Sequence, residues 1–210
     1  GMMALQILDG VLHHRGVVEP PLFFNLILAT LISHVGIVGG ILEEDEVKPN
    51  QPAEKYYTGK GEYKSFVGPS SNSVLWPHYI ERSLLFVDRN FRSLKNLNIE
   101  DVKSAIKFSD ISSKSTAKEQ TNFCHYVRSA HILAYMTQSQ YNQWLVRLYR
   151  SLEEANLLDH LGFDHLGKFR ENYSQHFWET FYSDLTHLIP LLRETEEGKM
   201  LLATLYSRMS

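Results

Sequence analysis

Cysteine is nearly absent from this sequence, with one residue, Cys124, in 210. A lone cysteine excludes a disulfide-stapled scaffold. An excess of one charge is also absent, because 21 basic and 24 acidic residues give a net charge of −3. The chain therefore has no general attraction to nucleic acid or anionic membranes. A hydrophobic content of 43% excludes a disordered chain and predicts one folded domain over residues 2–210.

Long hydrophobic runs are rare, and the strongest one is Leu22–Val38. It carries no formal charge and approaches the length of about 18–20 residues that a membrane-spanning helix needs. Asn25, Ser33 and His34 interrupt it, and a helix that is apolar all round is also typical of a protein core. We favour a core helix and keep a membrane-associated segment as the alternative. Because residues 2–13 contain no Lys or Arg, they do not form a secretory signal, and we expect a cytoplasmic protein.

Helical periodicity is present along most of the chain. Helices are expected over residues 5–14, ending at Gly16, and over 21–38. From residue 74 onward, apolar side chains recur at steps of three and four, beginning with Ile80, Leu84, Val87, Phe91 and Leu94. Arg82, Arg89 and Arg92 lie on the opposite side of that predicted helix. The sequence predicts an all-α fold of about seven to eight helices.

Residues 42–73 show no helical period and form the one long irregular excursion. Gly59–Lys60–Gly61 lies between two tyrosine-containing arms, which predicts a small β-hairpin. The acidic run Glu43–Glu46 can pair with the lysines of residues 55–64, and this explains the charge pattern without a nucleic-acid ligand. Aromatic side chains dominate binding surfaces, so the predicted ligand or partner contacts within this excursion are its aromatic residues Tyr56, Tyr57, Tyr63 and Phe66.

Two Asp–His pairs follow each other closely, at Asp159–His160 and Asp164–His165. Imidazole and carboxylate groups are ligands of Zn²⁺, Mn²⁺ and Fe²⁺, so His160, Asp164 and His165 are the candidate metal ligands. A further ligand would have to come from another helix, such as His125 or His131. The favoured alternative is a turn between helices that Gly162 breaks. We therefore predict no cofactor and keep a divalent metal as the alternative.

The remaining histidines do not converge in the sequence. On one continuous helix, His176, Asp184 and His187 would share a polar face, which indicates a solvated surface. Cys124 and its neighbour His125 diverge on a helix, so Cys124 is expected to be a small buried side chain and not a nucleophile. His131 borders an apolar stripe, where it is either a partly buried imidazole with a hydrogen-bond partner or a ligand contact.

No complete catalytic set is visible, and no catalytic residue is assigned. We expect a soluble helical protein that binds a protein partner or a small ligand without catalysis, with a homo-oligomer as one possible partner arrangement. The alternative is a helical-bundle enzyme with a pocket between helices that uses His131, His160, Asp164 or His165, either with or without a metal ion. The chain is histidine-rich, and protonation of all ten histidines would change its charge from −3 to +7.

Overall fold

The computed structural model describes residues 1–46, 55–65, 72–110 and 122–209. It confirms the all-α prediction: 70% of the described residues are helical, and they form eight helices of seven residues or more and one two-stranded antiparallel hairpin. The α-helices are α1 Met2–Arg15, α2 Pro20–Ile32, α3 Tyr79–Asn90, α4 Ile99–Phe108, α5 Asn122–Thr137, α6 Tyr141–Glu154, α7 Leu158–Leu161, α8 Leu166–Thr180, α9 Tyr182–Leu185, α10 Ile189–Leu192 and α11 Glu196–Met209. The 3-10 helices are η1 Val35–Ile37 and η2 Asn72–His78, and the strands are β1 Lys55–Tyr57 and β2 Tyr63–Ser65.

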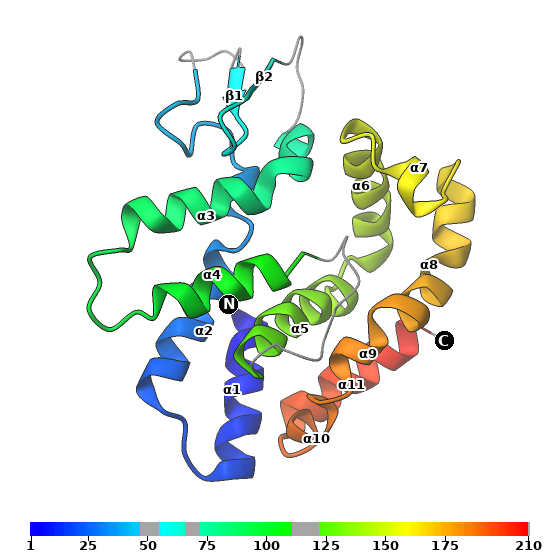
Figure 1. Cartoon of the computed structure of the whole chain (residues 1–210). Helices are drawn as coiled ribbons and strands as arrows, with labels where there is room; N and C mark the ends of the chain where they lie inside the picture. The colour runs from blue at the N-terminus through cyan, green and yellow to red at the C-terminus, as the bar shows by residue number, and fades with distance from the viewer. Residues whose placement is uncertain (47–54, 66–71, 111–121, 210) are drawn as a thin grey trace.

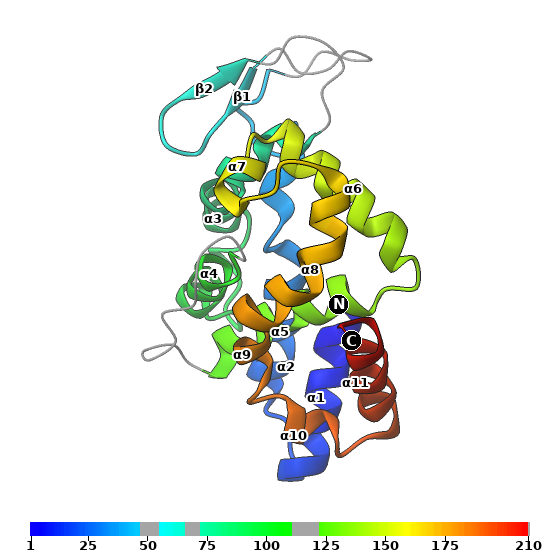
Figure 2. The same ribbon diagram turned by 90° about the vertical axis from the view of Figure 1, so that its right-hand side faces the viewer.

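Helix α5 lies at the centre, and α1, α2, α4, α6, α9 and α11 all contact it. Its ten buried residues include Cys124, as the sequence predicts. Helices α3 and α4 pack side by side, and α6 to α8 lie across from them (Figure 1). Figure 2 shows the hairpin projecting beyond this helical body, above α3. The core is therefore continuous through the helices, and the hairpin covers one end.

The helix predicted over residues 21–38 is shorter in the structure. It ends at Ile32, and a separate 3-10 turn follows at Val35–Ile37. This turn packs so closely on α3 that a Cβ at Gly36 would lie 2.2 Å from the carbonyl oxygen of Tyr79. The 18 residues Pro20–Ile37 have a mean hydropathy of 1.6, and 39% of them are buried. By length and composition alone, this stretch could also cross a membrane.

Arg82 corrects the predicted polar face of α3, because its side chain is fully buried. Its guanidinium binds both carboxylate oxygens of Asp45, at 2.9 Å and 2.8 Å, and donates to the carbonyl oxygens of Gly36, Val38 and Tyr57. Helical periodicity cannot foresee this burial, since the partner lies 37 residues away. The ion pair joins α3 to the segment that leads into the hairpin.

The predicted hairpin in residues 42–73 is present, with Tyr56 opposite Lys64 in the register. Gly59 and Gly61 have φ values of +86° and +84°, a conformation that favours glycine at both positions of this turn. Of the expected contacts between acids and lysines, Glu46 pairs with Lys55 at 3.8 Å. Lys60 instead pairs with Glu81 of α3 at 2.5 Å, which fastens the hairpin turn to the helical body.

Candidate functional site

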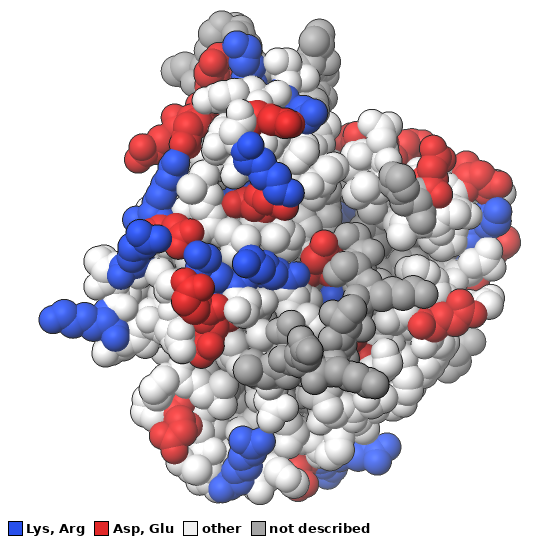
Figure 3. Space-filling model, viewed as in Figure 1, with Lys and Arg blue, Asp and Glu red and all other residues white. Residues whose placement is uncertain are grey.

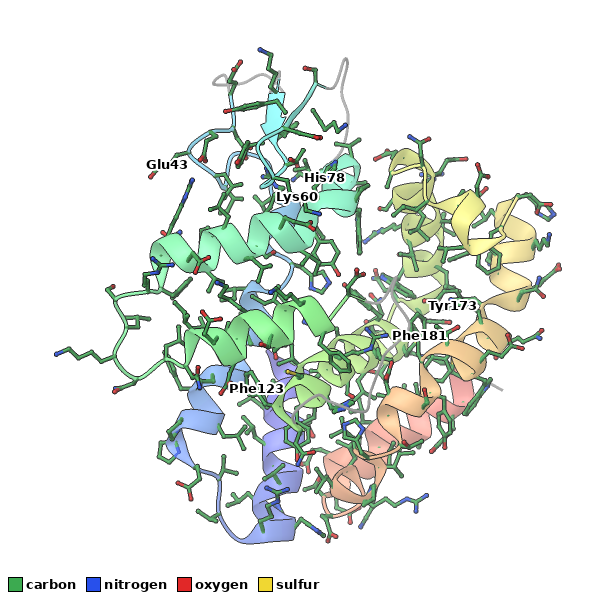
Figure 4. All side chains as sticks on the ribbon, viewed as in Figure 1. Glu43, Lys60, His78, Phe123, Tyr173 and Phe181 are labelled. Carbon is green, nitrogen blue, oxygen red and sulfur yellow. The ribbon has the colours of Figure 1, made fainter. Side chains whose placement is uncertain are left out.

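A pocket of about 310 Å³ lies between α3 on one side and α6, α7 and α8 on the other. Its wall is mainly aromatic and aliphatic. The lining side chains are Trp76, Pro77, Tyr79, Ile80, Glu81, Lys107, Asp110, Leu148, Leu152, Leu157, Leu161, Phe163, Phe169, Tyr173, His176 and Phe181. Figure 4 shows Tyr173 and Phe181 on the side of α8 that faces the other helices.

The chain forms the curved wall of this pocket by breaking its helices. Gly162 ends α7 in the left-handed region, which turns the chain so that Phe163 packs against Phe169 of α8. Helix α8 then ends at Thr180, and Phe181 caps it at the edge of the pocket. The breaks on both sides of α8 therefore bring together aromatic side chains from the turn after α7, from α8 itself and from the residue that follows α8.

The polar atoms in the pocket wall are mostly uncharged. Burial raises the pKa of the Tyr79 hydroxyl, and the Asp110 carboxylate raises it further, so this hydroxyl keeps its proton. The Tyr79 hydroxyl is itself buried, and the Asp110 carboxylate is its polar neighbour, although no described atom meets full hydrogen-bonding geometry with it. Burial also raises the pKa of Tyr173 and lowers that of His176. The pocket thus offers hydroxyl donors and a neutral imidazole in an apolar surrounding.

The pocket lining also includes three charged residues, Glu81, Lys107 and Asp110. Glu81 is occupied by its ion pair with Lys60. Lys107, at the end of α4, is exposed and forms no ion pair with another described residue. Its ammonium group can therefore face a polar or anionic substituent of a bound molecule.

Two imidazoles, the partly buried His34 and the buried His131, lie next to Tyr79 and to each other. The His34 ring stacks on the Tyr79 ring, with centroids 5.1 Å apart and an interplanar angle of 3°. Its Nδ1 lies 3.3 Å from the Ser33 hydroxyl, and its Nε2 lies 3.3 Å from the Tyr135 hydroxyl. Burial lowers the pKa of His34 to about 4, although the negative charge of Asp110 partly offsets this effect. The His34 ring is therefore neutral at physiological pH.

His131, a ligand-contact candidate from the sequence, belongs to this pair of imidazoles and does not line the pocket. Its Nε2 lies 2.6 Å from the Ser33 hydroxyl, and burial lowers its pKa well below the usual range. A serine hydroxyl beside an imidazole is the arrangement of a nucleophile and its base. Here the Ser33 side chain is fully buried and also contacts the carbonyl oxygen of Thr30, so a substrate does not reach it from the pocket.

A second pair of imidazoles corrects the predicted polar face of residues 176–187. Because the helix breaks at Phe181, this face is not continuous, and Asp184 turns inward to accept a 2.8 Å hydrogen bond from Arg128. The His187 ring lies 4.8 Å from that of His125. Burial lowers the pKa of His187 to about 4 and also lowers that of His125. His176 is likewise half-buried and lines the pocket.

The predicted contact residues of the hairpin lie away from the pocket. Tyr56 is buried and packs with Leu75, while the Tyr57 hydroxyl accepts a hydrogen bond from the Gly61 amide. Tyr63 is 49% exposed and packs against the Tyr57 ring. Phe66 lies outside the described residues. Of the three described tyrosines, Tyr63 is the one that presents a large exposed surface to a partner.

The predicted metal ligands are only partly described. The Asp164 carboxylate is exposed and pairs with Lys168 at 3.4 Å, and His165 caps α8 by accepting a hydrogen bond from the Lys168 amide. The side chain of His160 lies outside the description. Within the described residues, His, Cys, Asp and Glu side chains nowhere gather in a group of three that could hold a metal ion.

Sequence reasoning missed the pocket itself. A signal was present, because residues 163–181 contain Phe163, Phe169, Tyr173, Phe177 and Phe181 at a higher density than one core stripe requires. Phe177 is fully buried, whereas the other four line the pocket. The opposing wall comes from Trp76 and Tyr79, about a hundred residues earlier, and spacing in the sequence does not reveal such a distant approach.

Comparisons with known proteins identify the family but offer no close relative. No curated protein matches the chain, and no solved structure matches it. A family model described as Npun_R2479-like matches residues 1–210. The chain is therefore a member of the Npun_R2479-like family.

Proposed function

We propose that this helical protein is a binding module that holds a small, mostly apolar, ring-bearing molecule in the pocket between α3 and α6–α8. The observation that carries the proposal is the aromatic pocket itself, whose lining includes Tyr79 with its protonated hydroxyl and the neighbouring Asp110. A buried hydroxyl is stabilised by a well-aligned hydrogen bond, so this position favours a ligand that carries an acceptor atom. The proposal assigns no catalytic step.

Size and polarity define the class of ligand. A volume of about 310 Å³ is at the small end of ligand sites, which span roughly 300–1,000 Å³, and suits a compact molecule. Trp76, Tyr79 and Tyr173 offer ring faces and edges for aromatic packing. The ligand would place a carbonyl or similar acceptor near Tyr79 and leave any charged substituent at the mouth, beside Lys107.

The first test fills the pocket. The probe is 1-anilinonaphthalene-8-sulfonate, whose fluorescence rises in apolar sites, and the variant is Ile80→Trp, because Ile80 is half-buried in the pocket wall. We expect saturable binding to the wild type and at least about tenfold weaker binding to the variant. Met200→Trp, at a position 69% exposed on α11, is the control and should bind as the wild type does. Equal affinity in both variants, with native circular dichroism, contradicts the proposal.

The second test asks whether the Tyr79 hydroxyl donates a hydrogen bond to the ligand. Tyr79→Phe should weaken binding of 2-acetylnaphthalene, which carries a carbonyl acceptor, by about 3- to 10-fold, the worth of one neutral hydrogen bond. Binding of naphthalene, which has no acceptor, should not weaken. Displacement of the fluorescent probe measures both affinities. Parallel losses for the two compounds would show that Tyr79 acts through packing and not through its hydroxyl.

A further inference from the structure

A second recess lies between the start of α2 and the loop that joins α3 to α4, at the lower left of Figure 1. We call it the α2 groove. Its volume is about 800 Å³, and it shares no lining residue with the aromatic pocket. Its nine lining residues are Pro20, Pro21, Phe24, Asn25, Leu94, Lys95, Asn96, Leu97 and Asn98. Apolar, amide and basic side chains therefore meet in one recess.

Asn25 places a side-chain amide in the wall of this groove with an unsatisfied oxygen. The residue is 6% exposed, and its Oδ1 atom is buried without a hydrogen-bond partner among the described residues. The other polar side chain of α2 is satisfied, because the Thr30 hydroxyl donates to the Leu26 carbonyl oxygen at 2.7 Å. Leaving a buried amide oxygen unpaired is costly, so this position favours a ligand that brings an N–H donor.

The asparagine amide also determines which kind of donor fits. It carries one acceptor oxygen and one donor nitrogen, and a peptide group carries the complementary N–H and C=O. A nucleobase edge offers a similar pair of atoms, but proteins hold unpaired bases by stacking them on aromatic side chains. Phe24 is the one aromatic residue among the nine that line the groove. The lining therefore fits a peptide better than a nucleotide.

Apolar side chains form the two sides of the groove. Phe24 and the two prolines come from α2, and Leu94 and Leu97 come from the loop. Phe24 and Leu94 are each 43% exposed. An aliphatic side chain between them would remove this apolar surface from water, which is favourable.

Lys95 supplies the one charge in the groove wall. It is exposed and forms no ion pair with another described residue. The acidic side chains at the start of α4 are engaged elsewhere, because Asp101 accepts a 2.7 Å hydrogen bond from Asn98 and Glu100 lies 3.7 Å from Lys103. Figure 3 shows basic side chains projecting from the left edge of the molecule, where α3 and this loop lie. The ammonium group of Lys95 therefore favours a carboxylate on the ligand.

We propose that the α2 groove binds the carboxyl-terminal end of a peptide whose last residue is apolar. The N–H of that last residue donates to Asn25 Oδ1, and its carboxylate faces Lys95. Its side chain packs between Phe24 and Leu94. A chain end carries the N–H, the apolar side chain and the carboxylate on one residue, whereas an internal acidic residue needs a neighbour to supply the apolar side chain.

Fluorescence anisotropy with a labelled peptide tests the carboxylate. The probe is fluorescein-Gly-Gly-Ala-Leu with a free carboxyl end, and the comparison peptide ends in a carboxamide. We expect saturable binding of the probe and about tenfold weaker binding of the carboxamide. Lys95→Gln should weaken binding of the probe by a similar factor and leave binding of the carboxamide unchanged. Lys64→Gln, at an exposed position of the hairpin, is the control and should bind the probe as the wild type does.

Asn25→Leu tests the amide, because leucine has the same branched shape but forms no hydrogen bond. It should weaken binding of the probe by about tenfold or more. It should also raise the Tm, because an apolar side chain replaces a buried oxygen that has no partner in the free protein. Ile80→Trp, which fills the aromatic pocket, should bind the probe as the wild type does, so this test is independent of the proposed pocket ligand.

Four results would overturn the proposal. They are no saturable binding of the probe, equal affinity for the probe and its carboxamide, probe binding that Asn25→Leu leaves unchanged, and a lower Tm of Asn25→Leu. A fifth peptide experiment identifies the source of the carboxylate. If fluorescein-Gly-Gly-Asp-Leu carboxamide bound as tightly as the probe, the groove would read an acidic side chain and not a chain end, which would also overturn the proposal.

Discussion

The neutral, partly buried His34 makes the stability of the protein depend on pH. Its pKa is about 4 in the folded protein against the ordinary value of 6.5, with burial as the main cause. The folded state therefore binds fewer protons at this ring than the unfolded chain does between these two values. The stabilising contribution is fully present above pH 6.5 and is lost as the pH falls toward 4.

The magnitude follows from the two pKa values. At pH 5 the unfolded chain carries nearly one more proton at this position, and linkage lowers the free energy of unfolding by about 2 kcal/mol relative to pH 8. The perturbation we suggest is His34→Phe, because a phenyl ring can still stack on Tyr79 but does not titrate. Losing the contacts to Ser33 and Tyr135 lowers the stability of this variant at every pH. The informative quantity is therefore the slope of the free energy of unfolding against pH.

Urea unfolding followed by circular dichroism between pH 8 and pH 5 measures this slope. We expect the wild type to lose about 2 kcal/mol more over this range than His34→Phe. An NMR titration of the His34 imidazole in the folded wild type gives a second readout and should find it neutral at pH 5. Identical slopes in the two proteins, or titration of His34 near pH 6.5, would refute the reasoning.

Three further substitutions test the buried contacts. Arg82→Met leaves the buried Asp45 carboxylate without its cation and should cost about 3–5 kcal/mol in urea unfolding; a loss below 1 kcal/mol would show that the pair is dispensable. Gly36→Ala pushes η1 away from the Tyr79 carbonyl and should cost about 1–3 kcal/mol, seen as a lower Tm. Ser33→Ala removes the hydroxyl beside His131 Nε2 and should cost about 1–3 kcal/mol at pH 8, whereas Ser33→Thr should retain part of that stability.

The sequence predicted helix ends and turns correctly where residues close in the sequence determine them. Gly16 ends α1 in the left-handed region, as expected, and Asn98 caps α4 by accepting a hydrogen bond from the Asp101 amide. The hairpin turn was predicted in the same way, because Gly59 and Gly61 adopt the positive φ angles that this turn requires. In each case the residue that sets the structure and the backbone that it affects lie within a few positions of each other.

Contacts between distant segments were not predictable from periodicity. A helical wheel assumes one continuous helix, so it gave the wrong surroundings for Asp184 once the chain broke at Phe181. It also placed Arg82 on a solvated face, because the wheel does not include the Asp45 carboxylate that pairs with this side chain in the interior. The pocket arises in the same way, from α3 and α8 meeting across the fold. The candidate site is therefore a tertiary property of this chain.

The surroundings of the histidine side chains also change the interpretation of the histidine content. Burial lowers the pKa of six of the ten histidines, namely His34, His78, His125, His131, His176 and His187. The change from −3 to +7 that the sequence allows is therefore not a titration of the folded surface near pH 6. For these six rings, the unfolded chain binds a proton more readily than the folded protein does, so proton uptake favours unfolding. Mild acid should thus act on this protein mainly through its stability, with His34 and His187 contributing most clearly.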